Sequence, residues 1–299
     1  MQPKVSVLIP CYNAAAFIDE SIQSVLDQTF TDFELIIVDN ASDDATPQLV
    51  AKYCTHPRVQ YFRNRVNIGM SGNFNRCLTL AKGMYIKFLM ADDKFHPHLL
   101  ERFVEVLDNN PDVALVTSYR YLLTEKGTTK VFETPFAGLQ EGKKIIYSTL
   151  NDWNWIGEPT TVMFRSKNLD LGLFNPEYHY YLDWDMWLRH LAVGDCYFVP
   201  EPLSYFRMHG SQTSNKIKQN YSLYFEEYRF FKSIKTVKPY YIKDTAYNPK
   251  AQIKNKSFTL VKIGLKLLCK LKVRQWQVAY VALRTGWKDA LIPDRLRLH

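Results

Sequence analysis

The N-terminal part of the chain alternates between two spacings of apolar positions. Short β-branched runs predict strands at 5–9, 34–38, 59–63 and 85–90. The stretches between them carry apolar residues at every third or fourth position, which predicts helices at 15–27, 45–53 and 71–81. Right-handed crossovers between such strands produce an open parallel sheet. We therefore predict an α/β domain with a Rossmann-like, mostly parallel central sheet covered by helices on both faces.

This alternation stops after a helix at 98–107 and a strand at 113–118. The later pattern is mixed and predicts helices at 142–150 and 183–192 and strands at 160–164 and 196–199. We predict one domain over residues 1–214, built from halves at 1–118 and 119–214. A helical extension is predicted to follow at 215–299.

Polar residues follow the ends of the predicted strands. Because ligands of open α/β sheets bind at the carboxyl ends of the strands, these positions are candidate site residues. They are Pro10, Tyr12 and Asn13 after the first strand, Asp39 after the second, and Asp92 and Asp93 after the fourth. The chain has no G-x-G-x-x-G and no G-x-x-x-x-G-K-[ST] sequence, so the usual glycine-rich phosphate-binding loops are missing.

Asp92 and Asp93 put two adjacent carboxylates at the end of an apolar strand. Burying like charges side by side is costly unless a cation or hydrogen bonds compensate. One interpretation is a Mg²⁺ or Mn²⁺ site, since these ions take one or two carboxylates and complete their shell with water and phosphate oxygens. The other is a helix N-terminus, with Asp93 as the cap and Asp92 in solvent.

Asp39 and Asp183 also allow two interpretations each. Asp39 precedes Asp43 and Asp44, which suit a helix cap, and is itself placed to accept hydrogen bonds from a base or ribose in the crevice. Asp183 opens an amphipathic helix, where a carboxylate is stabilised as the anion. It is either a cap or a general base that deprotonates an attacking hydroxyl.

Arg207 and His209 alternate after the last predicted strand, so on an extended chain both face the same side. Together they offer a guanidinium fork for phosphate and an imidazole that serves as a metal ligand or donor. The alternative is a pair of solvated surface residues.

Seven motifs follow one another along residues 3–214. The first strand ends in P-x-Y-N, and the second is followed by VD-x-x-S-x-D-x-T. Asn67 and Gly69 belong to the stretch RNRVNIG, and then come FLMADD, GEPTTVMFR, LDWDMWLR and YFRMHGSQTS. In this order they resemble the family 2 glycosyltransferases of the GT-A fold, in which these segments are the nucleotide-binding loops, the metal-binding strand end, the acceptor-side strand, the base-bearing helix and the closing element.

The resemblance implies an inverting transfer of a sugar from a nucleotide-diphospho-sugar, with UDP the family's commonest nucleotide. The acceptor is a hydroxyl of a glycan or a lipid-linked molecule in surface polysaccharide or lipopolysaccharide synthesis. Residues 1–118 are expected to bind the nucleotide and residues 119–214 the acceptor. The donor nucleotide-binding residues implied are Pro10, Tyr12, Asn13, Asp39, Asn67, Gly69 and Asp92.

The resemblance also assigns the chemistry. It implies that Asp183 is the catalytic base, that Asp92 and His209 hold a divalent metal ion (Mg²⁺ or Mn²⁺), and that Arg207 and His209 stabilise the leaving diphosphate. Asp93, Glu158 and Trp184 are expected to support these groups. The family commonly has an acidic residue two places before Asp92, where this chain has Met90. A catalytically degenerate relative that binds nucleotide-sugar is therefore an alternative.

Charge is distributed unevenly along the chain. Residues 1–214 carry 19 Lys and Arg against 25 Asp and Glu, whereas residues 215–299 carry 19 against 5. Residues 220–231 predict a helix that docks on the domain, and residues 254–272 an amphipathic one. The latter has an apolar arc of Leu260, Val261, Leu267, Leu268 and Leu271 opposite Lys262, Lys266 and Lys270. We expect peripheral contact with an anionic membrane, the alternative being that the arc packs on the domain or on a second subunit of an oligomer.

Other classes of protein fit less well. The acidic strand ends and the missing glycine triplet disfavour a dinucleotide-dependent oxidoreductase. The basic extension lacks any zinc, RRM or helix-turn-helix signature, so no nucleic-acid partner is expected. No apolar stretch is long enough for a membrane span, and the five cysteines show no metal-type spacing and suit buried free thiols. We predict a cytoplasmic protein, peripheral at the inner face of the cell membrane.

Overall fold

The chain divides into two structural units, residues 1–209 and residues 210–299. The computed structural model describes residues 2–124, 127, 129–210, 212, 217, 221–237, 239–242, 247–269 and 273–290. The predicted domain boundary at 214 lies outside the described residues and stays a prediction. The predicted division at 118 falls inside strand β6, Val113–Thr124, which is longer than expected.

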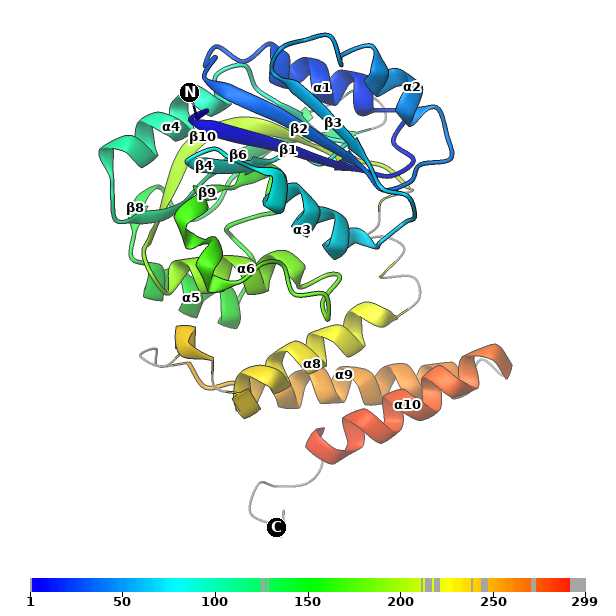
Figure 1. Ribbon diagram of the computed structural model, residues 1–299. Coiled ribbons are helices and arrows are strands. Elements are labelled where there is room, and N and C mark those ends of the chain that lie inside the picture. The colour runs from blue at the N-terminus through cyan, green and yellow to red at the C-terminus, as the bar shows by residue number, and fades with distance from the viewer. Residues whose placement is uncertain are drawn as a thin grey trace. The chain divides into compact units, whose positions relative to one another are not determined.

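Four parallel strands form the first half of the sheet in residues 1–209 (Figure 1). They are β1 (Val5–Cys11), β2 (Phe33–Asp39), β3 (Val59–Arg63) and β4 (Tyr85–Phe88). Their order is β3-β2-β1-β4, and the connecting helices are α1 (Ile18–Leu26), α2 (Thr46–Ala51) and α3 (Met70–Leu80). This is the parallel arrangement that the apolar runs predict.

Beyond β4 the sheet is mixed, in the order β9-β6-β10-β5. Strand β9 (Met163–Arg165) is antiparallel to β4 and β6, and β10 (Asp195–Met208) is parallel to β6. The short strands β5 (Lys94–Phe95), β7 (Thr129–Phe132) and β8 (Gly138–Gln140) pair antiparallel with β10, β6 and β10 respectively. The GT-A type of α/β fold expected from the sequence is thus present, with its parallel part confined largely to the N-terminal half.

Helices cover both faces of this sheet (Figure 1). Apolar residues of α1 and of α4 (Leu99–Asn109) pack with Val5, Val7 and Ile9 of β1 in one core. On the opposite face, α3 and α6 (Leu182–Leu191) contribute Phe74 and Trp187 to an aromatic cluster. Helix α5 (Gly142–Asn151) and the short 3₁₀ helices η1 (Pro159–Thr161) and η2 (Ser166–Leu171) complete the unit.

Two predicted strands differ from the observed elements. The strand expected at 160–164 is divided into η1 and β9, because Pro159 favours the start of a helical turn. The strand expected at 196–199 continues to Met208, with register shifts around Pro200 and Pro202, which lack the N–H group that a ladder needs. The thiols of Cys11, Cys77 and Cys196 are buried and free as predicted, but Cys54 is exposed.

Most of the described part of residues 210–299 is helical, with α8 (Ser222–Val237), η3 (Tyr240–Ile242), α9 (Lys250–Cys269) and α10 (Val273–Ala290). Leu260 and Leu267 of the predicted apolar arc are fully buried, and Gly286 of α10 lies against Leu260. This part of the arc therefore packs within the unit; Leu271 and Lys270 lie outside the described residues. Of the helices that the structure describes, none has both the length and the apolar character needed to cross a membrane.

Gly83 allows close approach of the chain before β4 to β1. A Cβ at this position would lie 2.4 Å from the backbone nitrogen of Ser6, and the Gly83 N–H donates to the Ser6 hydroxyl at 2.7 Å. Because strand backbone cannot move aside without breaking the ladder, Gly83→Ala is expected to cost about 2 kcal/mol of unfolding free energy. Thermal unfolding measures this loss as a lowered midpoint. Gly210→Ala is the control, since a Cβ there meets no atom within 4 Å; equal midpoints for both variants would contradict the prediction.

Candidate active site

The carboxyl ends of β1, β2 and β3 lie side by side. Parallel pairing aligns Cys11 with Asp39 and Asp39 with Arg63. Beyond β4 the chain continues along β1, because the N–H of Leu89 donates to the carbonyl of Leu8 at 2.9 Å. One end of the sheet therefore holds the predicted donor-binding residues that follow β1 and β2. The Asp92–Asp93 segment lies at the same end.

Asp39 is fully buried and is held by groups of the protein itself. Its Oδ1 accepts hydrogen bonds from the backbone and hydroxyl of Ser42, and its Oδ2 accepts one from the Tyr61 hydroxyl at 3.0 Å. Arg63 Nε lies 3.2 Å from Oδ2, and half of the Arg63 side chain is exposed. Arg63 is a site residue that our sequence analysis did not single out. Its position at the end of the third strand was the available signal.

The loop after β1 is tied to the loop after β2. Asn13 adopts a left-handed conformation with φ of 51°, which asparagine tolerates better than most residues. Its N–H donates to the Ser42 hydroxyl at 2.9 Å, and its side-chain oxygen accepts from the N–H of Asp43 at 3.0 Å. Pro10 is buried within β1, whereas Tyr12 is 49% exposed. The loop therefore holds an exposed aromatic ring at the strand ends.

Asp44 performs the helix-terminal role expected of this loop. Its carboxylate accepts hydrogen bonds from the N–H of Thr46, in the first turn of α2, and from the N–H of Ala15. Although partial burial opposes the shift, these hydrogen bonds lower the pKa of Asp44 below its usual value. The carboxylate thus joins the start of α2 to the loop after β1.

Asn67 and Gly69 belong to a network of amide side chains centred on Asn40. Asn40 Nδ2 donates to the side-chain oxygen of Asn67 at 2.8 Å and to the carbonyl of Gly69 at 3.1 Å. Gly69 precedes α3 with φ of 80°, a conformation that favours glycine. Both residues are exposed. The network fixes the loop before α3 against the end of β2.

Asp92 and His209 meet although 117 positions separate them. The Asp92 Oδ2 and His209 Nε2 atoms lie 2.9 Å apart, and 31% of the Asp92 side chain is exposed. The ring of Phe17, just before α1, lies 4.9 Å from the His209 ring, measured between centroids. The structure thus brings together the two residues that the resemblance implies as metal ligands.

Arg207 lies on the same side of the β10 end as His209. Its Nε donates to the carbonyl of Asp92 at 2.8 Å, its Nη2 donates to the carboxylate of Glu20, and its guanidinium lies over the Phe17 ring. Glu20 also accepts from Lys94 Nζ at 2.7 Å. Partial burial opposes the shift, but the charges and hydrogen bonds of Lys94 and Arg207 lower the pKa of Glu20. Glu20 was missed by sequence analysis because its partners lie far away along the chain.

Asp93 is buried and does not cap a helix. Helix α4 begins at Leu99, so the capping interpretation is wrong. Instead, Asp93 Oδ1 accepts from the backbone N–H of Arg207 at 2.9 Å, and Oδ2 accepts from the Thr160 hydroxyl at 2.6 Å. Burial, with the nearby charge of Asp92, raises the pKa of this carboxyl well above its usual value. Asp93 therefore links the Asp92 loop to β10 and to η1.

Asp183 lies within the first turn of α6 and does not occupy the cap position, which belongs to Tyr181. Its Oδ1 accepts from the N–H of Trp184 at 2.9 Å, and the amide of Asn154 lies 3.4 Å from its Oδ2. The half-buried Trp184 ring lies 4.9 Å from that of Tyr181. The acidic end of α6 is thus bordered by aromatic rings.

A chain of contacts connects the Asp92–Asp93 segment to Asp183. The Thr160 hydroxyl that donates to Asp93 also accepts from the N–H of Met90 at 3.1 Å. Close before η1, the carbonyl of Gly157 accepts from the Trp187 indole of α6 at 3.0 Å, and from Asn154. The segment around η1 therefore positions helix α6, with Asp183, relative to the Asp92–Asp93 segment.

Glu158 lies in this connecting segment. Its Oε1 is 3.1 Å from Arg120 Nε, and both side chains are largely buried. The Arg120 guanidinium stacks on the Phe132 ring with 4.2 Å to the centroid. Glu158 also contributes its charge near the buried Lys87, whose pKa burial lowers well below the usual value. These contacts support the segment that carries Thr160.

Asp92 and His209 fit a divalent metal ion shared with a bound diphosphate. Within the described ranges, no cluster of three or more His, Cys, Asp or Glu side chains forms a metal site from protein groups alone. A carboxylate and an imidazole are nonetheless both ligands of divalent ions, and Mg²⁺ or Mn²⁺ commonly completes its shell with phosphate oxygens and water. The donor set is therefore suitable only for a metal that arrives with, or is completed by, a phosphate ligand.

Comparison with known proteins agrees with this geometry. Residues 6–170 match the family model described as "Glycosyl transferase family 2". An uncharacterized glycosyltransferase of Haemophilus influenzae is 28% identical over 227 residues, which cover 71% of this chain and 68% of that protein.

Two solved structures share the fold. The first is Staphylococcus aureus TarS 1-349 in complex with UDP-GlcNAc, with a TM-score of 0.69, 19% identity, and coverage of 98% of this chain and 82% of that chain. The mannosyltransferase PcManGT of Pyrobaculum calidifontis, in complex with GDP-Man and Mn²⁺, has a TM-score of 0.59, 18% identity, and coverage of 97% and 88%. With more than half of its residues matched by the family model, the chain belongs to glycosyl transferase family 2.

Proposed function

We propose that this family 2 glycosyltransferase transfers a sugar from a nucleotide-diphospho-sugar, most simply a UDP-sugar, to an acceptor hydroxyl with inversion at the anomeric carbon. The observation that carries the proposal is the meeting of Asp92, Arg207 and His209 at the sheet end, joined through η1 to Asp183. One end of this arrangement suits a diphosphate, and the other offers a carboxylate to an incoming hydroxyl.

Arg207 and His209 are proposed to stabilise the diphosphate as it leaves. A guanidinium binds phosphate oxygens through its fork of N–H donors. Glu20, the Asp92 carbonyl and the Phe17 ring hold the Arg207 side chain in one orientation before a ligand arrives. Preorganised charges of this kind stabilise the charge that develops on a leaving group.

Asp183 is proposed to act as the general base. The acceptor oxygen forms a bond to the anomeric carbon while the bond from that carbon to the diphosphate oxygen breaks, and the electron pair leaves with the diphosphate. The proton of the acceptor hydroxyl passes to the Asp183 carboxylate. A single displacement from the face opposite the diphosphate inverts the configuration. The position of Asp183 in the first turn of α6 favours its anionic form.

Asp92 and His209 are the residues proposed to hold a divalent metal ion. When bound, Mg²⁺ or Mn²⁺ would neutralise negative charge on the diphosphate. Asp92, Arg63 and the exposed Tyr12 ring lie at the strand ends where the nucleotide is proposed to bind, with Asp39 fixing Arg63 beneath it.

The acceptor proposed is a glycan or a lipid-linked saccharide in surface polysaccharide or lipopolysaccharide synthesis, used in the cytoplasm at the inner face of the membrane. Trp153, 53% exposed and next to Asn154, and the rings of Tyr181 and Trp184 border the Asp183 end of the site. Aromatic rings of this kind stack on sugar faces through their apolar surface.

A degenerate relative that binds the donor without transferring it is the second candidate. Met90 stands where the family commonly has an acidic residue, and its backbone N–H donates a hydrogen bond to the Thr160 hydroxyl. Such a protein would bind nucleotide-sugar and show no turnover, so donor binding and transfer must be measured separately.

Donor binding is tested by thermal shift against UDP-, GDP- and dTDP-sugars, each with Mn²⁺, Mg²⁺ or EDTA. A bound ligand stabilises the folded protein by mass action, by about 2.7 kcal/mol at a hundred times its Kd. We expect a shift with one nucleotide that is reduced in EDTA. An unchanged melting curve with every donor would contradict the proposal.

Asp183→Asn is expected to lower the transfer rate by at least about a hundredfold while leaving the donor-induced thermal shift intact, because the amide cannot accept the hydroxyl proton. The rate is measured as release of nucleoside diphosphate dependent on acceptor. Asp170→Asn, which alters an exposed carboxylate in η2, is the control and should match the parent protein. Transfer at the parent rate in Asp183→Asn would contradict the role of Asp183 as base and leave it a structural role at the start of α6.

Asp92→Asn and His209→Gln are each expected to weaken the metal-dependent part of donor binding about tenfold or more, since each removes one of two ligands. Titration of Mn²⁺ in the presence of the nucleoside diphosphate, followed by calorimetry, measures the effect. His98→Gln, an exposed histidine next to α4, should behave as the parent. Parent-like Mn²⁺ titrations for both site variants would remove these residues from the metal site.

A further inference from the structure

The hairpin of α9 and α10 exposes an apolar face that differs from the arc expected from sequence. The contact between the two helices uses small residues: a Cβ on Gly264 would meet Leu283, and one on Gly286 would meet Ser257 and Leu260. Close packing at these positions turns the neighbouring residues to the sides of the pair. The exposed large side chains are Phe258, Leu265 and Leu268 of α9 and Tyr280, Val281 and Trp287 of α10, each between 36% and 62% exposed.

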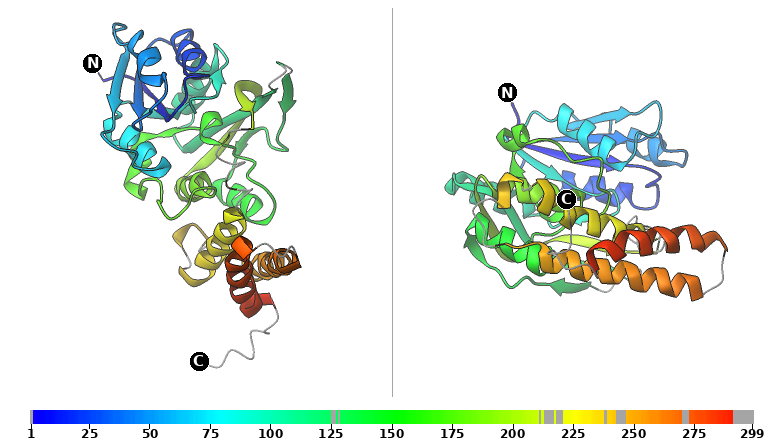
Figure 2. Two further views of the ribbon diagram at one scale, coloured as in Figure 1. Left: turned by 90° about the vertical axis from the view of Figure 1, so that its right-hand side faces the viewer. Right: turned by 90° about the horizontal axis from the view of Figure 1, so that it is seen from below.

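All of these except Val281 lie on one side of the hairpin: four directly follow a contact position, and Leu268 lies one helical turn after Leu265. Leu265 follows Gly264 and Phe258 follows Ser257 on α9, just as Trp287 follows Gly286 and Tyr280 follows Ala279 on α10. In an antiparallel pair of right-handed helices, the residue after each contact position turns toward the same side. The residue before the contact turns the other way: Lys256, before Ser257, pairs with Glu227 of α8 at 2.6 Å. Figures 1 and 2 agree in placing α8 along one side of the α9–α10 pair.

We call this surface, formed by Phe258, Leu265, Leu268, Tyr280 and Trp287, the hairpin face. Exposed cations surround it. Lys254 lies within it by helical spacing, Lys262 and Lys266 follow on α9, and Arg284 on α10 is exposed. Helix α9 contains five lysines and no acidic residue.

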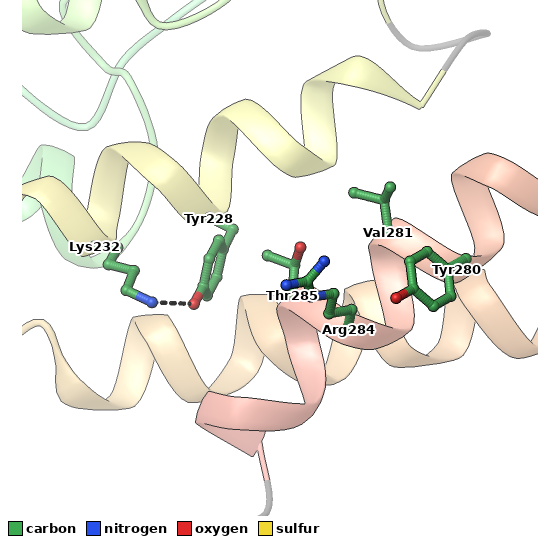
Figure 3. A pocket seen from close by; sticks show the side chains of 6 residues that line it. All are labelled: Tyr228, Lys232, Tyr280, Val281, Arg284 and Thr285. Atoms are coloured by element: carbon green, nitrogen blue, oxygen red, sulfur yellow. Dashed lines mark hydrogen bonds between the residues drawn. The ribbon is translucent and has the colours of Figure 1, made fainter.

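A shallow cavity of about 330 Å³ lies between α8 and α10, beside Tyr280 of the hairpin face (Figure 3). Its lining residues are Tyr228, Lys232, Tyr280, Val281, Arg284 and Thr285. Lys232 Nζ donates to the Tyr228 hydroxyl at 2.8 Å, as the dashed line in Figure 3 marks. Two cations, Lys232 and Arg284, thus lie beside the hairpin face.

We propose that the hairpin face binds the anionic surface of a phospholipid bilayer, with its aromatic and aliphatic side chains in the headgroup region and its cations on the lipid phosphates. An anionic bilayer surface binds protein surfaces that combine apolar side chains, interfacial tryptophan and tyrosine, and flanking lysine. The long Lys254 side chain reaches the headgroups from within the face. A second copy of this chain fits less well, since two hairpin faces would bring the exposed Lys254, Lys262, Lys266 and Arg284 of both copies together, and α9 has no acidic residue to oppose them.

The test is flotation of the full chain with vesicles of phosphatidylcholine alone and of an equal mixture of phosphatidylcholine and phosphatidylglycerol. We expect binding to the mixed vesicles that weakens with salt, and at least tenfold weaker binding to phosphatidylcholine. A Phe258→Ser, Leu265→Ser, Trp287→Ser variant should lose binding by about tenfold or more, because exposed apolar area drives insertion. Leu139→Ser, an exposed residue on β8, is the matched control and should bind as the parent.

The cations are tested with a Lys262→Gln, Lys266→Gln, Arg284→Gln variant. Each cation near an anionic surface contributes about fivefold, so binding to mixed vesicles should fall about a hundredfold. Lys167→Gln, an exposed residue of η2, is the control. Inorganic phosphate in molar excess over the lipid should not displace the parent protein at constant ionic strength, since a free phosphate offers no apolar layer.

Three results would overturn the proposal: no binding of the parent to mixed vesicles, parent-like binding by both triple variants, or a dimer in light scattering that the serine substitutions dissociate without any vesicle binding. The last would assign the face to a second copy. Flotation needs neither donor nor transfer, so its failure leaves the proposed activity untouched. Conversely, absence of sugar transfer with intact flotation would leave the proposal for the hairpin face unaffected.

Discussion

The candidate site depends on one buried carboxylate. Asp93 is 1% exposed, and its two oxygens accept hydrogen bonds from the β10 backbone at Arg207 and from Thr160 of η1. A buried acceptor left without donors lowers the free energy of unfolding by about 1–3 kcal/mol, and by more if it is charged. The hydrogen bonds to Asp93 therefore hold these two segments in place. The position of Asp93 therefore connects Arg207 and His209 on one side with helix α6 on the other.

A second buried carboxylate organises the ends of β2 and β3 in the same way. Asp39 is fully buried between Ser42, Tyr61 and Arg63, and so fixes the loop after β2 and a partly exposed cation at the end of β3. In both cases an acid at a strand end binds protein groups, while a neighbouring group remains accessible: Asp92 beside Asp93, and Arg63 beside Asp39. The buried acids give the exposed groups their orientation.

The C-terminal hairpin follows a different constraint. Gly264 and Gly286 let α9 and α10 approach closely, and this contact buries Leu260 and Leu267, for which the helical pattern leaves open whether a membrane, the domain or a second subunit is the neighbour. Periodicity identifies which residues of a helix share a side but does not identify the neighbour that covers them. The exposed face is consequently shifted around the helix, toward Phe258 and Leu265.

The sequence by itself determined the α/β class, the parallel strands that lead to the site and the family, because continuous apolar runs, helical spacing and ordered motifs are local signals. It also singled out Asp92 and His209, but their 2.9 Å contact spans 117 positions and arises only when β10 reaches the sheet end. The pairing of Glu20 with Arg207, the linking role of Asp93 and the extension of β10 past its prolines were decided by tertiary structure. Each of these depends on which strand lies beside which, and no local pattern of residues encodes that neighbour.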